Sequence, residues 1–245
     1  MQLVMVHGGN ENTPHLCKRA NWDYGSQFGA TLYQAPVMMD YVKGDFDKYL
    51  EQLSIHRPQM ALACDWIVRK LRDDYLYRIE AIAKLGIIPI VAAKHPEALY
   101  NDTSFHGMEL RIGLSVPTGY MNDGWIPPRQ YFDRKKPLHL LGGHPDQWKL
   151  LIRYYGEVGL EVKSIDGNAH YQQAYDYGKF WSRFGYYREM RGQGYDTNAL
   201  AVCSMRNARR YLENTVPIHP SKRIEACKKQ LGLLPKQYDF FRWVS

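Results

Sequence analysis

Short apolar runs that end in a polar residue or a glycine recur along most of this chain. Clear examples are Met60–Cys64, Ile87–Ala93 and Leu138–Leu141. Apolar runs of this length are typical of strands that are buried on both faces of a parallel sheet. Segments with helical spacing separate most of the runs, and this alternation predicts an α/β fold with a parallel sheet.

Polar residues or glycines follow about seven predicted strands. They are His7, Asp40, Asp65, Lys94, Ser115, Gly142 with Gly143, and Asp166. The carboxyl ends of parallel strands carry the sites of α/β proteins, so we expect these residues to share one edge. The pattern favours an irregular (β/α) TIM-type barrel. A doubly wound open sheet, which would place ligands at the same edge, is the alternative.

The segment Leu138–Asn168 shows this pattern most clearly. A strand ends at the glycine pair, a helix runs from Pro145 to Gly159, and a second strand ends at Asp166. Proline is tolerated in a first helical turn because its missing N–H would have no partner there. The Asp166-Gly167-Asn168 sequence suits either a ligand site or an ordinary turn.

The N-terminal third is harder to assign. We expect a first strand over Gln2–Val6, an irregular loop over Asn12–Gly29 and a second strand over Thr31–Met39. A helix over Arg69–Leu85 follows Asp65, so this residue is either a site carboxylate or the N-cap of that helix.

The excess of positive charge lies entirely in the C-terminal quarter. Residues 1–178 hold 19 Lys and Arg against 20 Asp and Glu, whereas residues 179–245 hold 13 against 5. A segregated basic segment is typical of proteins that bind polyanions, although a solvated basic face has the same composition. We therefore predict a barrel domain over residues 1–178 and a basic helical segment over residues 179–245, packed on the barrel.

Two helices are expected in this basic segment, Ser204–Asn214, with Ser204 as its N-cap, and Ser221–Leu231. Apolar stripes would face the barrel and basic side chains would face outward. The side chains predicted to bind nucleic acid are Arg206, Arg209, Arg210, Lys222, Arg223, Lys228 and Lys229.

Several classes of protein are disfavoured by what the sequence lacks. It contains no GxxxxGK[ST], GxGxxG, HExxH or GxSxG motif, its histidines lack metal-ligand spacing, and its four cysteines are scattered. We expect no metal and no cofactor. No apolar run reaches membrane-span length and the N-terminus does not resemble a signal peptide, so we expect a cytoplasmic protein with reduced thiols and no membrane partner.

Asp65 and Asp166 are the candidate catalytic residues, because both would project into the barrel mouth. Two carboxylates in one pocket can divide their roles, one as an ionised nucleophile and the other as a general acid/base with a raised pKa. This arrangement suits displacement at a sugar C1 carbon. His7, Lys94 and Ser115 would contact the substrate at the same edge.

Four short motifs carry a resemblance to a known family. They are Asp65-Trp66, Gly113–Pro117, His139–Gly143 and Ile165–Asn168. Over roughly Met60–Trp181 the chain resembles tRNA-guanine transglycosylases. It is most similar to phage-encoded members that are linked to 7-deazaguanine insertion into DNA.

The resemblance implies that Asp166 is the nucleophile, bonding to the sugar C1 carbon as guanine leaves. Gly142, Gly143 and Asn168 would lie near the incoming 7-deazaguanine base. Asp65 matches the general acid/base only loosely because the DSGGF-type run is absent, and the family's zinc ligands are missing too. These departures favour DNA over tRNA, in the cytoplasm of a bacterial or phage-infected cell.

Two other functions remain open from the sequence. A non-catalytic nucleic-acid-binding protein on a barrel scaffold would need only the basic face. A base-releasing N-glycosidase would need only the converging carboxylates.

Overall fold

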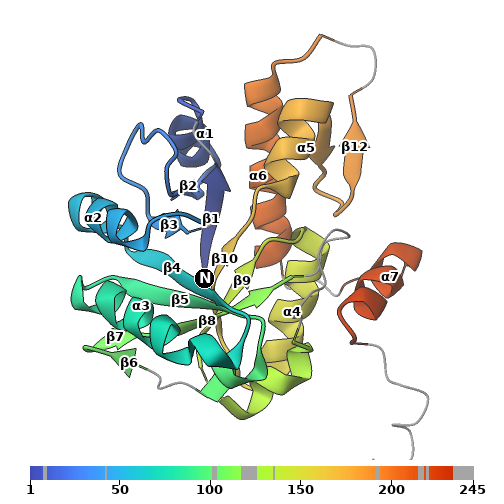
Figure 1. Ribbon diagram of the computed structural model, residues 1–245. Helices are drawn as coiled ribbons and strands as arrows, with labels where there is room; N and C mark the ends of the chain where they lie inside the picture. The colour runs from blue at the N-terminus through green and yellow to red at the C-terminus, as the bar shows by residue number, and fades with distance from the viewer. Residues whose placement is uncertain are drawn as a thin grey trace, which may run out of the picture.

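Eight parallel strands form a closed barrel in the computed structural model (Figure 1), which confirms the predicted fold class. The structure describes residues 1–7, 10–41, 43–100, 104–116, 126–134, 136–190, 194–214, 218 and 221–233. Around the barrel the strands are β1 (Gln2–His7), β2 (Asp23–Gln27), β3 (Met38–Asp40), β4 (Met60–Trp66), β5 (Ile88–Ala93), β8 (Arg111–Ser115), β9 (Leu138–Leu141) and β10 (Val162–Asp166). β10 pairs with β1, with Asp166 opposite Val4, and this pairing closes the barrel.

The connections between strands are irregular. Helices α1 (Thr13–Ala20), α2 (Phe46–His56), α3 (Arg72–Lys84) and α4 (Pro145–Glu157) follow β1, β3, β4 and β9. In the described part of the chain, no helix separates β2 from β3. Between β5 and β8 lie the 3₁₀ helix η2 (Pro96–Tyr100) and a small hairpin of β6 (Ser104–Phe105) and β7 (Met108–Glu109). The 3₁₀ helix η3 (Pro128–Arg134) precedes β9, and the short helix η1 (Arg69–Leu71) precedes α3.

The barrel interior has an apolar half and a polar half. Val4, Val6, Met38, Met60, Leu62, Ile90 and Ala92 form one interior cluster, contributed by β1, β3, β4 and β5. Their sequence neighbours belong to the larger core between strands and helices, as the two-residue period of a strand requires. On β8, β9 and β10, the corresponding interior positions hold Arg111, His139, Ser164 and Asp166.

The C-terminal part packs on this barrel. α5 (Ala169–Tyr177) leads into an antiparallel hairpin of β11 (Lys179–Trp181) and β12 (Tyr187–Glu189), followed by α6 (Thr197–Glu213) and α7 (Lys222–Gln230). α6 packs against α1, α4 and α5 (Figure 1), and the Trp22 indole N–H donates to the carbonyl oxygen of Met205 at 3.0 Å. Met205 and Ala208 belong to the same core as the barrel helices. The division into domains at residue 178 stays a prediction.

The prediction of the second strand is wrong. It lies at Asp23–Gln27, inside the segment expected to be a loop, and helix α1 precedes it; the segment expected as strand two contributes only Met38–Asp40. A Cβ on Gly25 would lie 2.8 Å from Val6 Cγ2 and 2.9 Å from Val4 Cγ1. Tertiary packing therefore selects a glycine at this strand position, although glycine has a low intrinsic strand propensity.

The prediction that Ser204 caps a helix is also wrong. α6 begins seven residues earlier, and its N-cap is Asp196, whose Oδ1 accepts from the N–H groups of Asn198 and Ala199 at 2.9 and 3.3 Å. Ser204 is buried within the helix, and its hydroxyl donates to the carbonyl oxygen of His170 at 2.7 Å. Ser221 does cap α7, accepting from the Ile224 N–H at 3.2 Å. None of the described helices combines the length and apolar character needed to cross a membrane.

Candidate active site

Asp166 lies at the carboxyl end of β10 and points into the polar half of the barrel. Its side chain is largely buried, with a residue exposure of 8%. Oδ1 accepts from the backbone N–H of Gly142 at 3.1 Å, and Nε2 of His139 lies 3.5 Å from the same oxygen. The structure therefore brings together Asp166 and Gly142, two of the predicted site residues.

A chain of polar contacts continues from Asp166 through the barrel interior. Nδ1 of His139 lies 2.7 Å from the Ser164 hydroxyl, which also accepts from Arg111 Nη1 at 2.9 Å. Arg111 in turn pairs with Glu109 through Nε at 3.3 Å. The sequence analysis singled out neither Arg111 nor Ser164 for the site, and His139 only as part of a motif.

The Asp166 carboxylate selects the tautomer of His139. A serine hydroxyl that accepts from Arg111 can still either donate to or accept from Nδ1 of His139, so Ser164 suits both tautomers. A carboxylate only accepts, so the ring nitrogen that faces Asp166 is the one that carries a proton. The N–H of His139 therefore faces the Asp166 carboxylate.

Asp40 is a third carboxyl group at this edge of the barrel. Burial, and then the negative charges of Asp166 and Asp65, raise its pKa to about 7 against the opposing effect of a hydrogen bond with the Gln27 side chain. A carboxyl with a pKa near neutrality can both give and take a proton at physiological pH. The sequence placed Asp40 at a strand end but did not assign it a role.

Asp65 is paired with a cation. Its Oδ2 accepts from Lys94 Nζ at 2.6 Å, and both side chains are partly exposed. Because α3 begins at Arg72, Asp65 is not the N-cap of that helix. Asp65 and Asp166 both influence the pKa of Asp40, so the three carboxyl groups belong to one electrostatic cluster at the carboxyl ends of the strands.

The other predicted substrate-binding residues lie at or near the ends of the barrel strands. Asn168 donates from Nδ2 to the carbonyl oxygen of Val6 at 3.2 Å, which ties the end of β10 to β1. Gly143 has φ +86°, and a Cβ there would lie 2.6 Å from Val116 Cγ1, so a glycine is required. Ser115 is half-buried at the end of β8, level with Leu141. The side chain of His7 lies outside the described residues.

Two of the predicted nucleic-acid-binding arginines contact the end of α1. Arg206 donates from Nε and Nη2 to the carbonyl oxygen of Arg19 at 3.0 and 2.7 Å, and Arg209 donates to that of Asn21. Both guanidinium groups thus satisfy carbonyls at the C-terminal end of α1, which have no partners within that helix. Arg206 is nevertheless exposed and Arg209 is half-buried, and their role in binding nucleic acid stays a prediction.

The other predicted basic contacts fall into two groups. Arg210, Lys222 and Lys229 are exposed, whereas Lys228 pairs with Glu225 at 2.8 Å. Arg223 is exposed as well, but it also has contacts within the protein. Its Nη1 lies 3.0 Å from the buried Asp146, and its guanidinium stacks over the Trp181 ring with the carbon 5.5 Å from the ring centroid.

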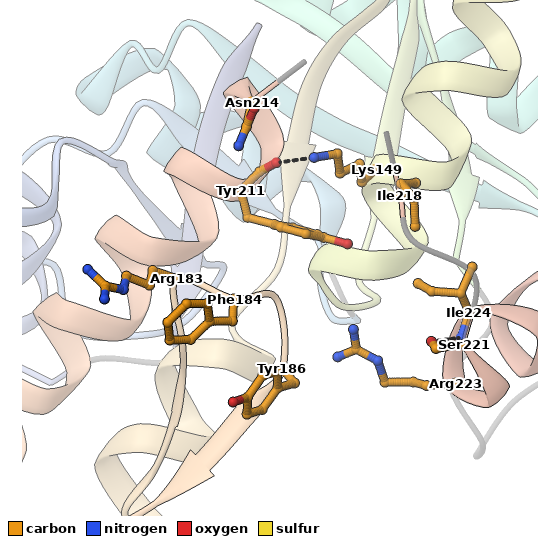
Figure 2. A pocket seen from close by; sticks show the side chains of 10 residues that line it. All are labelled: Lys149, Arg183, Phe184, Tyr186, Tyr211, Asn214, Ile218, Ser221, Arg223 and Ile224. Atoms are coloured by element: carbon orange, nitrogen blue, oxygen red, sulfur yellow. Dashed lines mark hydrogen bonds between the residues drawn. The ribbon is translucent and has the colours of Figure 1, made fainter. Parts of the chain in front are cut away.

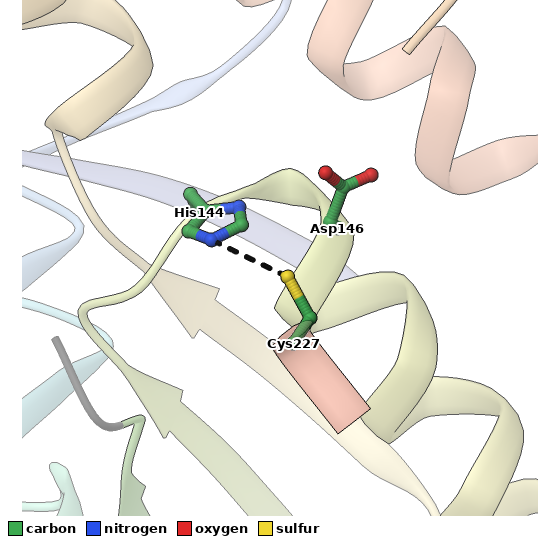
Figure 3. A group of neighbouring side chains, drawn as sticks. All are labelled: His144, Asp146 and Cys227. Carbon is green, nitrogen blue, oxygen red and sulfur yellow. Dashed lines mark hydrogen bonds between the residues drawn. The ribbon is translucent and has the colours of Figure 1, made fainter. Parts of the chain in front are cut away.

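His144, Asp146 and Cys227 form a second polar cluster, between the start of α4 and α7 (Figure 3). Their potential ligand atoms all lie within 4.8 Å of one another, so they could contribute to a divalent metal site. Sequence reasoning missed the cluster because Cys227 is far from the other two in the chain.

The surroundings of this cluster fit a metal poorly. Asp146 already receives the Tyr211 hydroxyl at 2.7 Å and the Arg223 guanidinium. Burial raises the pKa of Cys227 to about 11, so the thiol keeps its proton at neutral pH, whereas a metal would need the thiolate. Burial and then Arg223 lower the pKa of His144 to about 4. The cluster joins α7 to α4 through neutral groups and one ion pair.

A model of a protein family of unknown function, DUF6610, matches residues 25–213. The chain belongs to the DUF6610 family. The match covers α6 and every barrel strand except β1 and the first two residues of β2. No curated protein matches the sequence.

Solved structures with a similar arrangement include two isomerases. Phosphoribosyl anthranilate isomerase from Thermus thermophilus has 9% identity and a TM-score of 0.48, over 87% of this chain and 98% of that chain. N-(5'-phosphoribosyl)anthranilate isomerase from Pyrococcus furiosus has 11% identity and a TM-score of 0.43, over 85% and 99%. Likeness at this level carries no argument about activity.

Proposed function

We propose that this protein exchanges guanine in DNA for a 7-deazaguanine base through a covalent intermediate on Asp166. The observation that carries the proposal is one pair of carboxyl groups in the barrel mouth. Asp166 is oriented by a backbone N–H and faces the N–H of His139, while Asp40 has its pKa raised to about 7. One carboxyl suits a nucleophile and the other suits proton transfer.

In this mechanism the Asp166 carboxylate attacks the sugar C1 carbon while the bond from C1 to the guanine nitrogen breaks. The electron pair of that bond passes to the departing base, which takes a proton from Asp40. The incoming base then loses its proton to Asp40, and its nitrogen displaces Asp166 from C1. Atoms and charges balance over the two steps, and Asp40 returns to its starting state.

Asp40 takes the acid/base role in this proposal in place of Asp65. The Lys94 Nζ donates to Asp65 Oδ2 at 2.6 Å, so Asp65 already has a partner, whereas the pKa of Asp40 is raised to about 7, where a general acid works best at neutral pH. Asp65 with Lys94 then serves as a charged pair that tunes Asp40 and faces the substrate. This choice changes the sequence-based assignment and is tested separately below.

The DNA would need its target base turned out of the stack to reach the barrel mouth. Arg210, Lys222 and Lys229 are exposed and can contact phosphates. The four cysteines are free, which agrees with the proposed cytoplasmic location.

The test is a trapping and exchange experiment with guanine-containing DNA and a labelled 7-deazaguanine base. The wild-type protein should form a denaturation-resistant protein–DNA adduct and incorporate the label. Asp166→Asn should lose both, while Asp176→Asn, an exposed Asp on α5, should behave as wild type. Abasic DNA without incorporated label would instead identify a base-releasing N-glycosidase. DNA binding without adduct, incorporation or abasic product would identify a non-catalytic binding protein.

A further inference from the structure

A cavity of about 450 Å³ is lined by residues of the C-terminal part and of α4 (Figure 2), and none of the three carboxyl groups of the barrel mouth lines it. Its walls come from the turn of the β11–β12 hairpin, the end of α6, α4 and the start of α7. The side chains that matter for its chemistry are Lys149, Arg183, Phe184, Tyr186, Tyr211 and Arg223.

Two aromatic rings stand exposed at the hairpin side of this cavity. Phe184 is 58% exposed and Tyr186 is 43% exposed, and their rings are stacked with centroids 6.3 Å apart and an interplanar angle of 19°. The guanidinium carbon of Arg183 lies 4.8 Å from the Phe184 centroid, and that of Arg188 lies 6.0 Å from the Tyr186 centroid. Core packing does not account for rings left this open to solvent.

Cations line the same cavity. Lys149 donates from Nζ to the carbonyl oxygen of Tyr211 at 2.8 Å, and burial with the neighbouring Arg153 lowers the pKa of Lys149. Within the described residues Arg183 has no carboxylate partner, and Arg223 shares its charge with Asp146. Three basic side chains therefore surround the cavity and one buried carboxylate offsets them, so its potential is positive.

We propose that this cavity binds a nucleotide, with the base stacked on Phe184 and Tyr186 and a phosphate held by Arg183, whose guanidinium lies beside the Phe184 ring. Bases stack on exposed aromatic rings whatever their sequence, and arginine guanidinium groups match phosphate oxygens in pairs. The same chemistry is presented by a free nucleotide and by a nucleotide within a single strand. The inference stands apart from base exchange, because it requires no reaction at the barrel mouth.

Fluorescence anisotropy with a labelled oligodeoxythymidylate of about 12 nucleotides tests this binding. The probe contains no guanine, so the result is independent of base exchange. The double variant Phe184→Ala/Tyr186→Ala should weaken binding by about tenfold or more, because base–aromatic stacking is lost. Arg183→Gln should weaken binding and reduce its salt dependence. Arg183, Phe184 and Tyr186 are exposed, so these variants should retain the fold.

Tyr177→Ala is the matched control, since Tyr177 is a 63% exposed aromatic residue on α5 outside the cavity. It should bind the probe as the wild type does. The variant Phe184→Trp/Tyr186→Trp should bind at least as tightly as the wild type, because it keeps two stacking rings.

Competition identifies the source of the nucleotide. Displacement of the probe by dTMP at concentrations far below those of inorganic phosphate supports a free nucleotide as ligand. Probe binding that depends on the two rings, but resists both competitors, supports a nucleotide within a strand. Displacement by inorganic phosphate as readily as by dTMP, or unchanged binding in the double alanine variant, would overturn the proposal.

Discussion

The imidazole of His139 lies with Nε2 3.5 Å from Oδ1 of Asp166. Because a carboxylate can only accept, the nitrogen that faces it is the protonated one, and the Ser164 hydroxyl at 2.7 Å from Nδ1 can donate to that second nitrogen. The contact is longer than an ordinary hydrogen bond, as is common for catalytic groups without substrate. The orientation of Asp166 therefore depends on residues that never touch the substrate.

This relationship predicts the behaviour of His139→Leu. Asp166 would keep its backbone contact with Gly142 and lose the imidazole that faces it. We expect kcat for base exchange to fall by about 10-fold to 100-fold with KM nearly unchanged, because the nucleophile is misplaced. Steady-state kinetics measure kcat and KM separately. An equal loss in KM would show that His139 shapes binding, contrary to this account.

Asp40→Asn should change the pH dependence of stability. The pKa of Asp40 is raised from 3.8 to about 7 in the folded protein. The unfolded chain releases this proton as pH rises above about 4 while the folded protein keeps it, so stability is lost between about pH 4 and pH 7. The upper bound is about 4 kcal/mol. Denaturant unfolding at several pH values measures the free energy of unfolding, and Asp40→Asn should remove its decrease with pH. An equal pH dependence of stability in the variant would contradict the prediction.

Asp65→Asn separates the two candidate acid/base residues. The Asp65–Lys94 pair is partly exposed, so its removal should cost less than about 1 kcal/mol. The negative charge of Asp65 raises the pKa of Asp40, and Asp65→Asn removes this charge. The transition in the pH–rate profile that reflects ionisation of Asp40 should therefore move to lower pH. The rate at the optimum should stay within a few-fold. A loss as deep as that of Asp40→Asn would return the acid/base role to Asp65.

His170→Phe should make the protein more tolerant of acid. Burial lowers the pKa of His170 from 6.5 to about 3, and both ring nitrogens lack hydrogen-bond partners. As pH falls below about 6.5 the unfolded chain takes up a proton that the folded protein refuses, so stability is lost down to about pH 3. Phenylalanine preserves the stacking on Trp22, where the centroids lie 4.5 Å apart, and cannot titrate. Thermal melts at about pH 4 and about pH 7 should differ less in the variant than in the wild type.

Arg206→Gln should destabilise the fold. Arg206 donates two hydrogen bonds to the Arg19 carbonyl, so its loss should cost about 1 kcal/mol. Arg210→Gln is the control on the same helix, because Arg210 is exposed, and it should leave stability unchanged while weakening DNA binding. Equal stability in the two variants would show that the contact with α1 contributes nothing.

The sequence predicted those parts of the fold that depend on local pattern. The runs at Met60–Cys64, Ile87–Ala93 and Leu138–Leu141 are strands in the barrel, because buried parallel strands need continuous apolar residues. Asp23–Gln27 carries no such run. Its place in the barrel is set by Val4 and Val6 of β1, which fill the space above Gly25. That information lies in another strand and not in the segment itself.

The candidate site was predictable in position but not in chemistry. The edge of the barrel that carries the site was predicted from polar residues that recur directly after the strands, and this pattern identified Asp65 and Asp166. The raised pKa of Asp40 depends on burial and on two charges from other strands, and the contacts of Asp166 with His139 depend on the pairing of β9 with β10. Such long-range effects have no local sequence signal.

The pairing of β1 with β10 also constrains how the chain can fold during synthesis. β1 meets β2 early, but its other edge stays unpaired until Asp166 has been made, and α1 waits still longer for Met205 and Arg206 of α6. Such distant pairings slow folding, and ribosomes add only about 5–20 residues per second. A nascent chain therefore carries an open strand edge for on the order of ten seconds or more. That interval is when this protein is most exposed to aggregation and to chaperone capture.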